Sequence, residues 1–288
     1  MKNLSGKVAV ITGAASGLGR GLAAVLAAEG CRLALVDVHA ERLAEVAAEH
    51  PGCSTHVVDV SDRAAMAALP EAVIAAHGAV HLVVNNAGVT ITASFLDHSI
   101  DDLEWLLGIN LWGVIYGCRA FLPHLLAGGE GHIINISSLF GIIGVPGQSA
   151  YCISKYGVRG LSEALHEELA LQEADVGITV VHPGAINTRI ISSARKNGQD
   201  LDRAARFFER HGMSPLTAAT QIVAAVKRNQ LRLTVTREAW WLDLIKRIFP
   251  TWGNRIAVRG MLKTMGMKTL APQRAADIEE PDQSSTAS

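Results

Sequence analysis

The stretch Val8-Ala-Val-Ile-Thr-Gly-Ala-Ala-Ser-Gly-Leu-Gly19 decides the fold of this chain. An apolar, partly β-branched run leads into three glycines spaced G-x-x-x-G-x-G, and an Ala- and Leu-rich segment follows. A strand, a glycine turn and a helix N-terminus in this order form a phosphate cradle, because free N–H groups and the helix dipole favour an anion. The pattern predicts that this turn binds a dinucleotide pyrophosphate, and an ordinary glycine turn is the structural alternative. The residues concerned are Gly13, Ser16, Gly17, Leu18 and Gly19.

The alternation of strand and helix continues through most of the chain. Apolar runs occur at 33–36, 56–58, 81–84, 133–136 and 178–181, and Ala-rich helical segments occur at 17–29, 41–49, 62–77, 103–126 and 150–171. Such runs suit strands buried on both faces, and strict alternation favours a parallel sheet between two helical layers. We therefore predict an α/β, doubly wound Rossmann fold of three layers (αβα) and about seven strands.

The domain organisation is predicted to be simple. No long linker interrupts residues 1–268, which we interpret as a single domain with a helical extension at about 237–268. A helix at 215–228 and a short strand at 231–235 are expected before that extension. Residues 269–288 are rich in Pro, Glu, Gln, Ser and Thr, a composition typical of a disordered tail.

Composition excludes several function classes. Hydrophobic residues make up 49% of the 288 residues, and 26 Lys and Arg balance 27 Asp and Glu, so no charge pattern for nucleic acid is present. The four cysteines have no C-x-x-C spacing, and no histidine falls in a metal-ligand motif, so no metal site is predicted. Without a signal peptide or an uncharged apolar run of spanning length, a cytoplasmic location is expected.

Asp37 ends the second predicted strand, 24 residues after Gly13. An acid at this point can accept hydrogen bonds from the adenosine ribose and repels a 2′-phosphate. Ser16, where a basic residue would favour that phosphate, is neutral. NAD is therefore predicted over NADP, although Arg20, His39 and Arg42 lie close in sequence.

Tyr151 and Lys155 lie four residues apart on a predicted helix and so share a face. A nearby ammonium favours the phenolate and is expected to lower the pKa of Tyr151. Ser138 follows the predicted strand at 133–136 and is placed to face the phenol. On spacing alone, a plain helix surface is the alternative interpretation of Tyr-x-x-x-Lys.

The ordered set of motifs resembles the short-chain dehydrogenases/reductases. The resemblance covers roughly residues 5–190. It rests on Gly13/Gly17/Gly19, Asn85-Asn86-Ala87-Gly88, Asn110, Ser138, Tyr151-x-x-x-Lys155 and Pro183-Gly184, all in family order.

The resemblance implies further roles. Asp59 would contact the adenine with Val60 beside it, and Asn86, Ala87 and Gly88 would line the cofactor ribose. For Asn85 a purely structural role is an equal alternative. The nicotinamide carboxamide would be held by Pro183, Gly184, Ile186 and Thr188. Asn110 would hold a water that links Lys155 to solvent, and a helix-kink asparagine is the structural alternative.

A mechanism and a substrate class follow as expectations. Tyr151 would act as base in oxidation and acid in reduction, Lys155 would bind the nicotinamide ribose and support Tyr151, and Ser138 would hold the substrate oxygen. The loops at 89–96, 139–148 and 186–211 hold many apolar side chains, among them Ile190, Ile191, Phe207 and Phe208. We therefore expect an NAD-dependent alcohol dehydrogenase/ketone reductase for a hydrophobic secondary alcohol or ketone of steroid-, terpenoid- or aryl-alkyl type.

The C-terminal extension leaves two interpretations open. Trp240, Trp241, Leu244, Ile245 and Ile248 form an apolar stripe at helical spacing. The predicted helix at 238–249 either packs on the body or a partner subunit, or lies in a membrane interface with Lys246, Arg247 and Arg255 towards lipid phosphates. Alternative functions are a membrane-associated lipid or retinoid dehydrogenase/reductase and a catalytically silent NAD(H)-binding regulator. A homodimer or homotetramer is expected.

Overall fold

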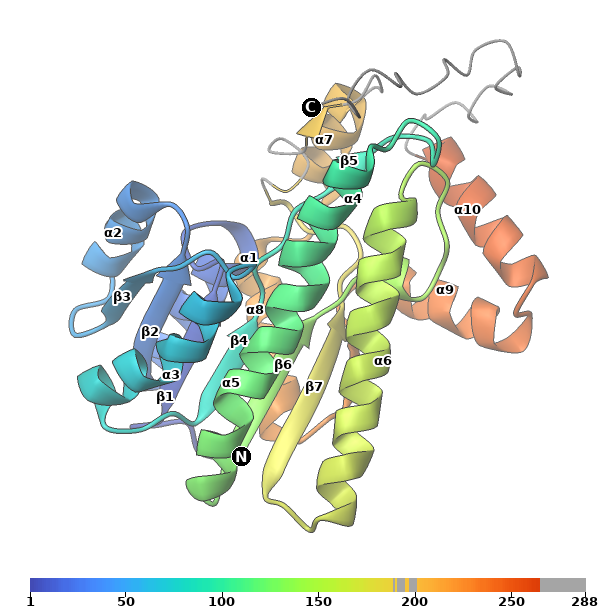
Figure 1. Ribbon diagram of the computed structural model, residues 1–288. Helices are drawn as coiled ribbons and strands as arrows, with labels where there is room; N and C mark the ends of the chain where they lie inside the picture. The colour runs from blue at the N-terminus through green and yellow to red at the C-terminus, as the bar shows by residue number, and fades with distance from the viewer. Residues whose placement is uncertain (189, 191–194, 197–200, 265–288) are drawn as a thin grey trace, which may run out of the picture.

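A computed structural model describes residues 1–188, 190, 195–196 and 201–264. Its centre is a parallel sheet of seven strands in the order β3-β2-β1-β4-β6-β7-β9 (Figure 1). The strands are β1 (Val8–Thr12), β2 (Arg32–Asp37), β3 (Ser54–Val57), β4 (Leu82–Asn85), β6 (Gly131–Ile136), β7 (Val176–His182) and β9 (Arg232–Thr234). The chain therefore winds outward from β1 in both directions, which confirms the doubly wound Rossmann fold.

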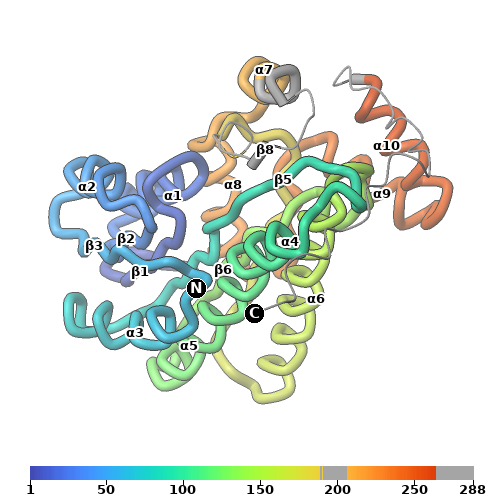
Figure 2. The backbone as a smooth tube through the Cα atoms, turned by 45° about the horizontal axis from the view of Figure 1, so that its top comes forward, coloured from blue at the N-terminus to red at the C-terminus, as the bar shows by residue number. Residues whose placement is uncertain are grey.

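Two layers of helices cover the sheet, and successive strand residues face opposite layers. In β1, Ala9 and Ile11 pack in one core cluster, whereas Val8 and Val10 pack in the other. One layer contains α1 (Gly17–Ala28), α2 (Ala40–Ala48) and α8 (Pro215–Lys227), and the opposite layer contains α3 (Arg63–His77), α5 (Gly113–Ala127) and α6 (Ser149–Leu171). Figure 2 shows the two layers on opposite sides of the strands. Continuous apolar strands are stable here because both faces are buried.

Among the residues that the structure describes, one helical run is long and apolar enough to cross a bilayer by length and composition alone. It comprises α4 (Ile100–Leu107), a π-helical turn η1 (Gly108–Trp112) and α5. Four side chains of α5, namely Val114, Cys118, Phe121 and Leu125, belong to the core cluster beneath the sheet. The α5 part of this run is thus a layer helix of the Rossmann fold.

The structure differs from the sequence prediction at the periphery. The segment at 56–58 was predicted as a strand buried on both faces, but β3 is an edge strand in which half-buried and exposed residues alternate. The segments 89–96 and 186–211 were predicted as loops, but they contain a two-stranded sheet of β5 (Ile91–Thr92) and β8 (Arg195–Lys196) and the helix α7 (Leu201–His211). Ile191 and the predicted tail at 269–288 lie outside the described residues.

The C-terminal extension forms two helices, α9 (Arg237–Ile248) and α10 (Trp252–Thr264). Their inner residues Ala239, Ala257 and Val258 join a third core cluster with Leu139, Ile142, Ile143, Val145 and Cys152. In Figure 1 the pair stands beside α6, next to the loop that follows β6. The inner face of the extension therefore packs on the body of the same chain.

Acid is expected to destabilise the fold through His132 in β6. Its imidazole is fully buried, and Nε2 lies 2.8 Å from the Thr179 hydroxyl, which itself donates to the Gln230 carbonyl. Burial lowers the pKa of His132 from 6.5 to about 3. Between these two pH values the unfolded chain binds more protons, so stability is complete above about pH 6.5 and falls by up to about 1.4 kcal/mol per pH unit below it.

His132→Gln tests this expectation because glutamine keeps an N–H donor for Thr179 but does not titrate. Chemical denaturation at pH 7 and pH 5 should show a smaller loss of unfolding free energy in the variant than in the parent chain. Equal losses would show that His132 does not carry the acid sensitivity.

Candidate active site

The sequence-predicted site residues follow the carboxyl ends of neighbouring strands. Gly13 comes after β1, Asp37 ends β2, Asn86 comes after β4, Ser138 comes after β6 and Pro183 comes after β7. Because these strands are parallel, their carboxyl ends meet along one edge of the sheet. The fold thus brings the glycine turn, the acid and the Ser-Tyr-Lys group to that edge.

The glycine turn has the geometry of a phosphate cradle. Gly13 and Gly17 have φ angles of +65° and +51°, which favour glycine. A Cβ atom on Gly19 would lie 2.1 Å from the Gly13 carbonyl oxygen, so only glycine fits there. The Ser16 side chain makes no capping hydrogen bond to the start of α1, and Leu18 turns its side chain into the core. The backbone N–H groups at the start of α1 therefore suit a pyrophosphate.

Thr12 supports this turn, although the sequence analysis gave it no role. Its buried hydroxyl accepts from the backbone N–H groups of Asn86 and Ala87 at 2.9 and 3.1 Å and donates to the Val84 carbonyl. The Asn86 amide donates to the carbonyls of Thr12 and Gly13. The end of β4 is thus fixed against the glycine turn. A threonine at the end of an apolar strand was the only signal in the sequence.

Asn85 belongs to the core and not to this turn. Its amide donates to Asn135 Oδ1 at 2.8 Å, and both residues are buried with Cys118 and Ser162 in one polar network. Of the two interpretations left open for Asn85, the structure favours the structural one.

Asp37 is buried at the end of β2, directly beside the glycine turn. Its Oδ2 accepts from the Ala15 N–H and its Oδ1 from the His39 N–H, both at 3.0 Å. The nearby basic residue Arg20 is paired with Glu49 instead of facing Asp37. The Asp37 carboxylate is thus held beside the glycine turn, and the charge of Arg20 is paired with Glu49.

Asp59 and Val60 lie after β3, at the outer side of the site. The Asp59 carboxylate is exposed and accepts from the Ser61 N–H and hydroxyl at 2.9 and 2.7 Å. Val60 is buried, and a Cβ atom on Gly113 would meet its side chain at 2.8 Å. Val60 therefore anchors this loop to α5, while Asp59 faces outward.

Tyr151 lies beside Ser138 at the start of α6. Ser138 lies close enough to the phenol to lower the pKa of Tyr151, and its hydroxyl accepts from the Phe140 N–H at 3.1 Å. The Phe140 ring packs edge-on against the Tyr151 ring at 6.0 Å between centroids. This environment raises the pKa of Tyr151 to about 12, because burial outweighs the lowering by Ser138.

Lys155 is buried one turn further along α6. Its Nζ lies 5.5 Å from the centroid of the Tyr151 ring and donates to the Ile136 carbonyl at 2.9 Å. Burial lowers the pKa of Lys155 to about 8. In the chain alone the pKa of Tyr151 is therefore raised overall, because desolvation dominates, and its lowering by Lys155 stays a prediction.

Asn110 occupies the π-helical turn η1, where the α4–α5 run is interrupted. Its Oδ1 accepts from the Val89 N–H at 2.8 Å, and its Nδ2 donates to the Val89 carbonyl at 2.9 Å. A Cβ atom on Gly88 would lie 3.3 Å from Asn110 Oδ1 and 3.6 Å from Lys155 Nζ. Asn110, Gly88 and Lys155 are thus neighbours. The side chain of Asn110 bonds the Val89 backbone from an irregular helical turn, as the helix-kink interpretation expects.

The segment after β7 closes the other side of the site. Pro183 accepts from the Leu139 N–H, and a Cβ atom on Gly184 would meet the Thr236 hydroxyl at 2.1 Å. Ile186 is buried and forms a bridge with Met213. The Thr188 side chain lies 3.2 Å from the Cβ position of Gly17. This segment therefore reaches across to the glycine turn.

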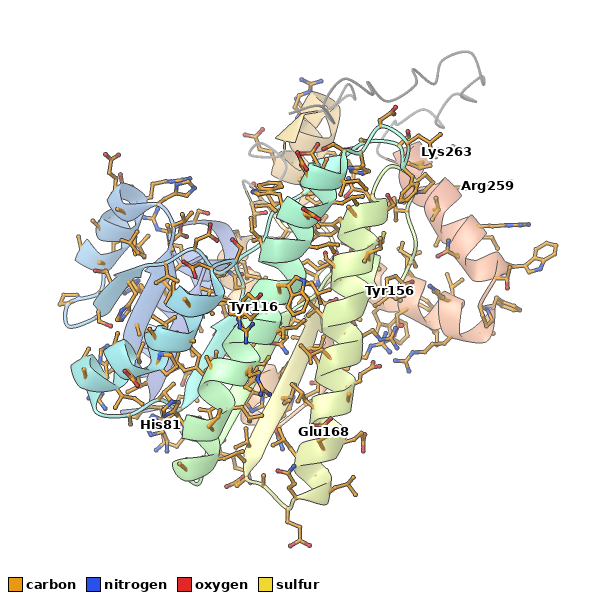
Figure 3. The ribbon with its side chains drawn as sticks, in the orientation of Figure 1. His81, Tyr116, Tyr156, Glu168, Arg259 and Lys263 are labelled. Atoms are coloured by element: carbon orange, nitrogen blue, oxygen red, sulfur yellow. The ribbon has the colours of Figure 1, made fainter. Side chains whose placement is uncertain are left out.

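Two further side chains position the loop after Ser138, and the sequence analysis missed both. His182 Nδ1 lies 3.1 Å from the Ser138 carbonyl oxygen, and burial lowers the pKa of His182 to about 4. Lys246 of α9 donates to the Ile142 carbonyl and to the Tyr156 hydroxyl. Figure 3 shows Tyr156 on the side of α6 that faces α9. Both contacts are long-range and leave no local sequence signal.

Comparison with known proteins gives a consistent match. The family model described as short chain dehydrogenase matches residues 7–199. The SadH protein of Mycobacterium tuberculosis, named as an oxidoreductase, is 42% identical over 270 residues, which are 91% of this chain and 98% of that protein.

Solved structures agree with this match. A short-chain dehydrogenase/reductase from Burkholderia phymatum in complex with NAD has a TM-score of 0.77 at 29% identity, covering 95% of this chain and all of that one. Levodione reductase has a TM-score of 0.72 at 30% identity, covering 80% of this chain and 96% of that one.

Proposed function

The chain belongs to the short-chain dehydrogenase family of oxidoreductases, and we propose that it transfers a hydride between NAD(H) and a hydrophobic secondary alcohol or ketone. One observation carries this proposal: Tyr151, with Ser138 beside its phenol and Lys155 Nζ 5.5 Å from its ring centroid, lies at the sheet edge that also bears the glycine turn. Bound nicotinamide would supply the hydride acceptor or donor. The protein's own residues would bind, orient and move a proton.

Tyr151 Oη is the proposed proton acceptor in oxidation and donor in reduction. The Ser138 hydroxyl, which lies beside that phenol, is placed to donate to the same substrate oxygen. Charge developing on this oxygen would then meet a donor that is already in position. Two hydrogen bonds fix the position of Ser138. The Phe140 N–H bonds its hydroxyl, and His182 Nδ1 bonds its carbonyl oxygen.

Lys155 and Asn110 would complete the relay. Lys155 Nζ keeps two of its three N–H donors beyond the bond to Ile136, and these would serve the cofactor ribose and a water. A π-helical turn displaces backbone carbonyls from the regular helical ladder, which makes η1 suited to hold that water. We propose that the proton passes from Tyr151 through this route to solvent.

The proposed coenzyme is NAD, held by the glycine turn, Asp37 and the residues the family resemblance implies. The carboxylate of Asp37 stands beside the turn with no basic partner among its hydrogen bonds, and Arg20 is paired with Glu49. Such a setting suits ribose hydroxyls and repels a 2′-phosphate.

Asp37→Ala should weaken NADH binding by roughly tenfold to a hundredfold, the range of a lost charge-assisted hydrogen bond. It should also reduce the difference between the affinities for NADH and NADPH, because the Asp37 carboxylate no longer repels the 2′-phosphate of NADPH. Fluorescence titration with both coenzymes measures the two effects. Unchanged NADH affinity in a folded variant would remove Asp37 from the coenzyme site.

The substrate is proposed to be bulky and apolar. The loop after Ser138 contributes Leu139, Ile142, Ile143 and Val145 to the third core cluster, and the half-buried Phe140 packs on Tyr151. An apolar loop beside Tyr151 suits a hydrophobic secondary alcohol or ketone. A panel of such alcohols assayed with NAD⁺ and NADP⁺ at the absorbance of the reduced nicotinamide tests both the reaction and the coenzyme.

A catalytically silent NAD(H)-binding regulator is the alternative on the same fold. It would bind NADH normally yet turn over no alcohol in the panel. The presence of Ser138 and Lys155 beside the Tyr151 phenol argues against a silent regulator, since such a protein needs none of the three residues.

We also propose that the protein is cytoplasmic and that it forms a homodimer or homotetramer.

A further inference from the structure

The hairpin of α9 and α10 carries an unusual concentration of exposed large apolar side chains. Six of them are between 50% and 73% exposed. These six, here called the hairpin patch, are Trp240, Trp241, Ile248, Phe249, Trp252 and Ile256. Helical spacing places Trp240, Trp241 and Ile248 on one face of α9, and Trp252 and Ile256 on one face of α10. Three of the five tryptophans of the chain thus lie on this surface.

The hairpin that bears this patch is firmly packed on the body of the protein. The opposite faces of both helices are committed to the third core cluster through Ala239, Leu242, Ala257, Val258 and Met261. Lys246, which we expected to face lipid, instead points inward to the Ile142 carbonyl and Tyr156. Because both inner faces pack on the same cluster, both outer faces point away from the body.

Basic side chains surround the hairpin patch. The segment 237–264 holds six Lys and Arg against two Asp and Glu, whereas the whole chain has 26 and 27, so the rest holds 20 and 25. Both acids are on α9, and Asp243 is already paired with Arg232 and Arg247. On α10, Arg255, Arg259 and Lys263 are exposed beside Trp252 and Ile256, and no acid lies on that helix. Figure 3 shows Arg259 and Lys263 on α10.

We propose that the hairpin patch docks on an anionic lipid bilayer. Tryptophans are favoured at the boundary between headgroups and acyl chains, and a helix with aromatic and basic residues on its outer face lies in that plane. The local positive charge matches an anionic surface. A second copy of this chain is the poorer occupant, since a twofold contact sets this positive patch against itself.

Docking would bring the substrate loop close to the bilayer. The inner face of the hairpin contacts Leu139, Ile142 and Val145, and Lys246 bonds the Ile142 carbonyl. This loop begins at Ser138 beside Tyr151, and its Phe140 ring packs on the Tyr151 ring. A membrane-dissolved alcohol or ketone would then reach the site beside the docked hairpin; this last step rests on the proposed function, but the docking does not.

Vesicle co-sedimentation of the full chain tests the docking. The probes are vesicles of phosphatidylcholine alone and of phosphatidylcholine with phosphatidylglycerol, at low and high salt. Binding is expected only to the second kind and to weaken with salt. R255E/R259E should bind at least about 30-fold more weakly, since each basic residue near the surface contributes about fivefold. The control R63E/R228E changes net charge equally at exposed arginines outside the hairpin and should bind like the parent.

A second pair of variants tests the apolar contribution without touching the core. Trp252→Ser removes a side chain that is 73% exposed, and Leu171→Ser is its control at an exposed leucine at the end of α6. Only Trp252→Ser should lower vesicle binding.

Equal binding to both vesicle types, or equal loss of binding in R63E/R228E, would overturn the proposal. A change from dimer to monomer in Trp252→Ser by sedimentation velocity would overturn it in favour of a second copy. NADH binding, which needs no membrane, reports separately on the proposed function.

Discussion

Tyr151→Phe is expected to lower kcat by about 10²- to 10⁴-fold, the usual contribution of a positioned acid–base group. The substitution removes the proposed proton carrier, the phenol beside Ser138, and leaves the ring against Phe140. NADH affinity should change little, because the glycine turn and Asp37 are untouched. Initial rates and NADH fluorescence titration on the same preparation separate the two effects.

Tyr116→Phe is the matched control. Tyr116 (Figure 3) is a half-buried tyrosine of α5 whose ring lies tilted against Trp112, and it packs on the core cluster that contains Val114 and Phe121. Its loss should leave kcat within about threefold of the parent, as expected for a hydroxyl outside the site. If Tyr151→Phe kept most of its activity, another group would have to carry the proton.

Gly19→Ala is expected to abolish coenzyme binding and to destabilise the fold. The added methyl would lie 2.1 Å from the Gly13 carbonyl oxygen and 2.8 Å from the Asn86 amide, so the turn between β1 and α1 has to move. Overpacking against backbone should cost about 3 kcal/mol or more of unfolding free energy. A cradle displaced to that extent should bind NADH at least about 100-fold more weakly.

Gly160→Ala controls for the general effect of alanine in a helix. Gly160 lies within α6, and nothing stands within 4 Å of its Cβ position. This change should stabilise the chain by roughly 0.5–1 kcal/mol, because glycine loses more backbone entropy on folding. Thermal unfolding should therefore shift in opposite directions in the two variants, and NADH titration should show weaker binding only in Gly19→Ala. Normal NADH affinity in Gly19→Ala would rule out this turn as the phosphate cradle.

Local patterns predict the central part of this fold well. The apolar run from Val8 and the glycines after it specify strand, turn and helix through interactions within a few residues. Strict alternation of such strand and helix units favours a parallel sheet between two helical layers, and the structure confirms this prediction. Because the site residues follow strand ends, their convergence at one edge comes with the topology.

Long-range packing explains what the sequence did not predict. The exposure of β3 depends on its place at the sheet edge, and the burial of Tyr151 depends on Phe140 and the loop around it. The inward direction of Lys246 depends on a contact with Ile142, 104 residues away in the chain. Helical spacing correctly placed Tyr151 near Lys155 but could not weigh charge against desolvation, and desolvation decides the pKa of both groups.

The central claim is that Tyr151 becomes a base only with the coenzyme in place. In the chain alone burial raises the pKa of Tyr151 to about 12, so the phenol keeps its proton at neutral pH and cannot act as a base. The direct test is a pH titration of Tyr151 by ¹³C NMR of labelled tyrosine, with Tyr151→Phe to assign the signal, without and with NAD⁺. We predict a pKa near 12 without NAD⁺ and a fall of several units with it, since the positive nicotinamide favours the phenolate. An unchanged pKa in the two titrations would contradict the account.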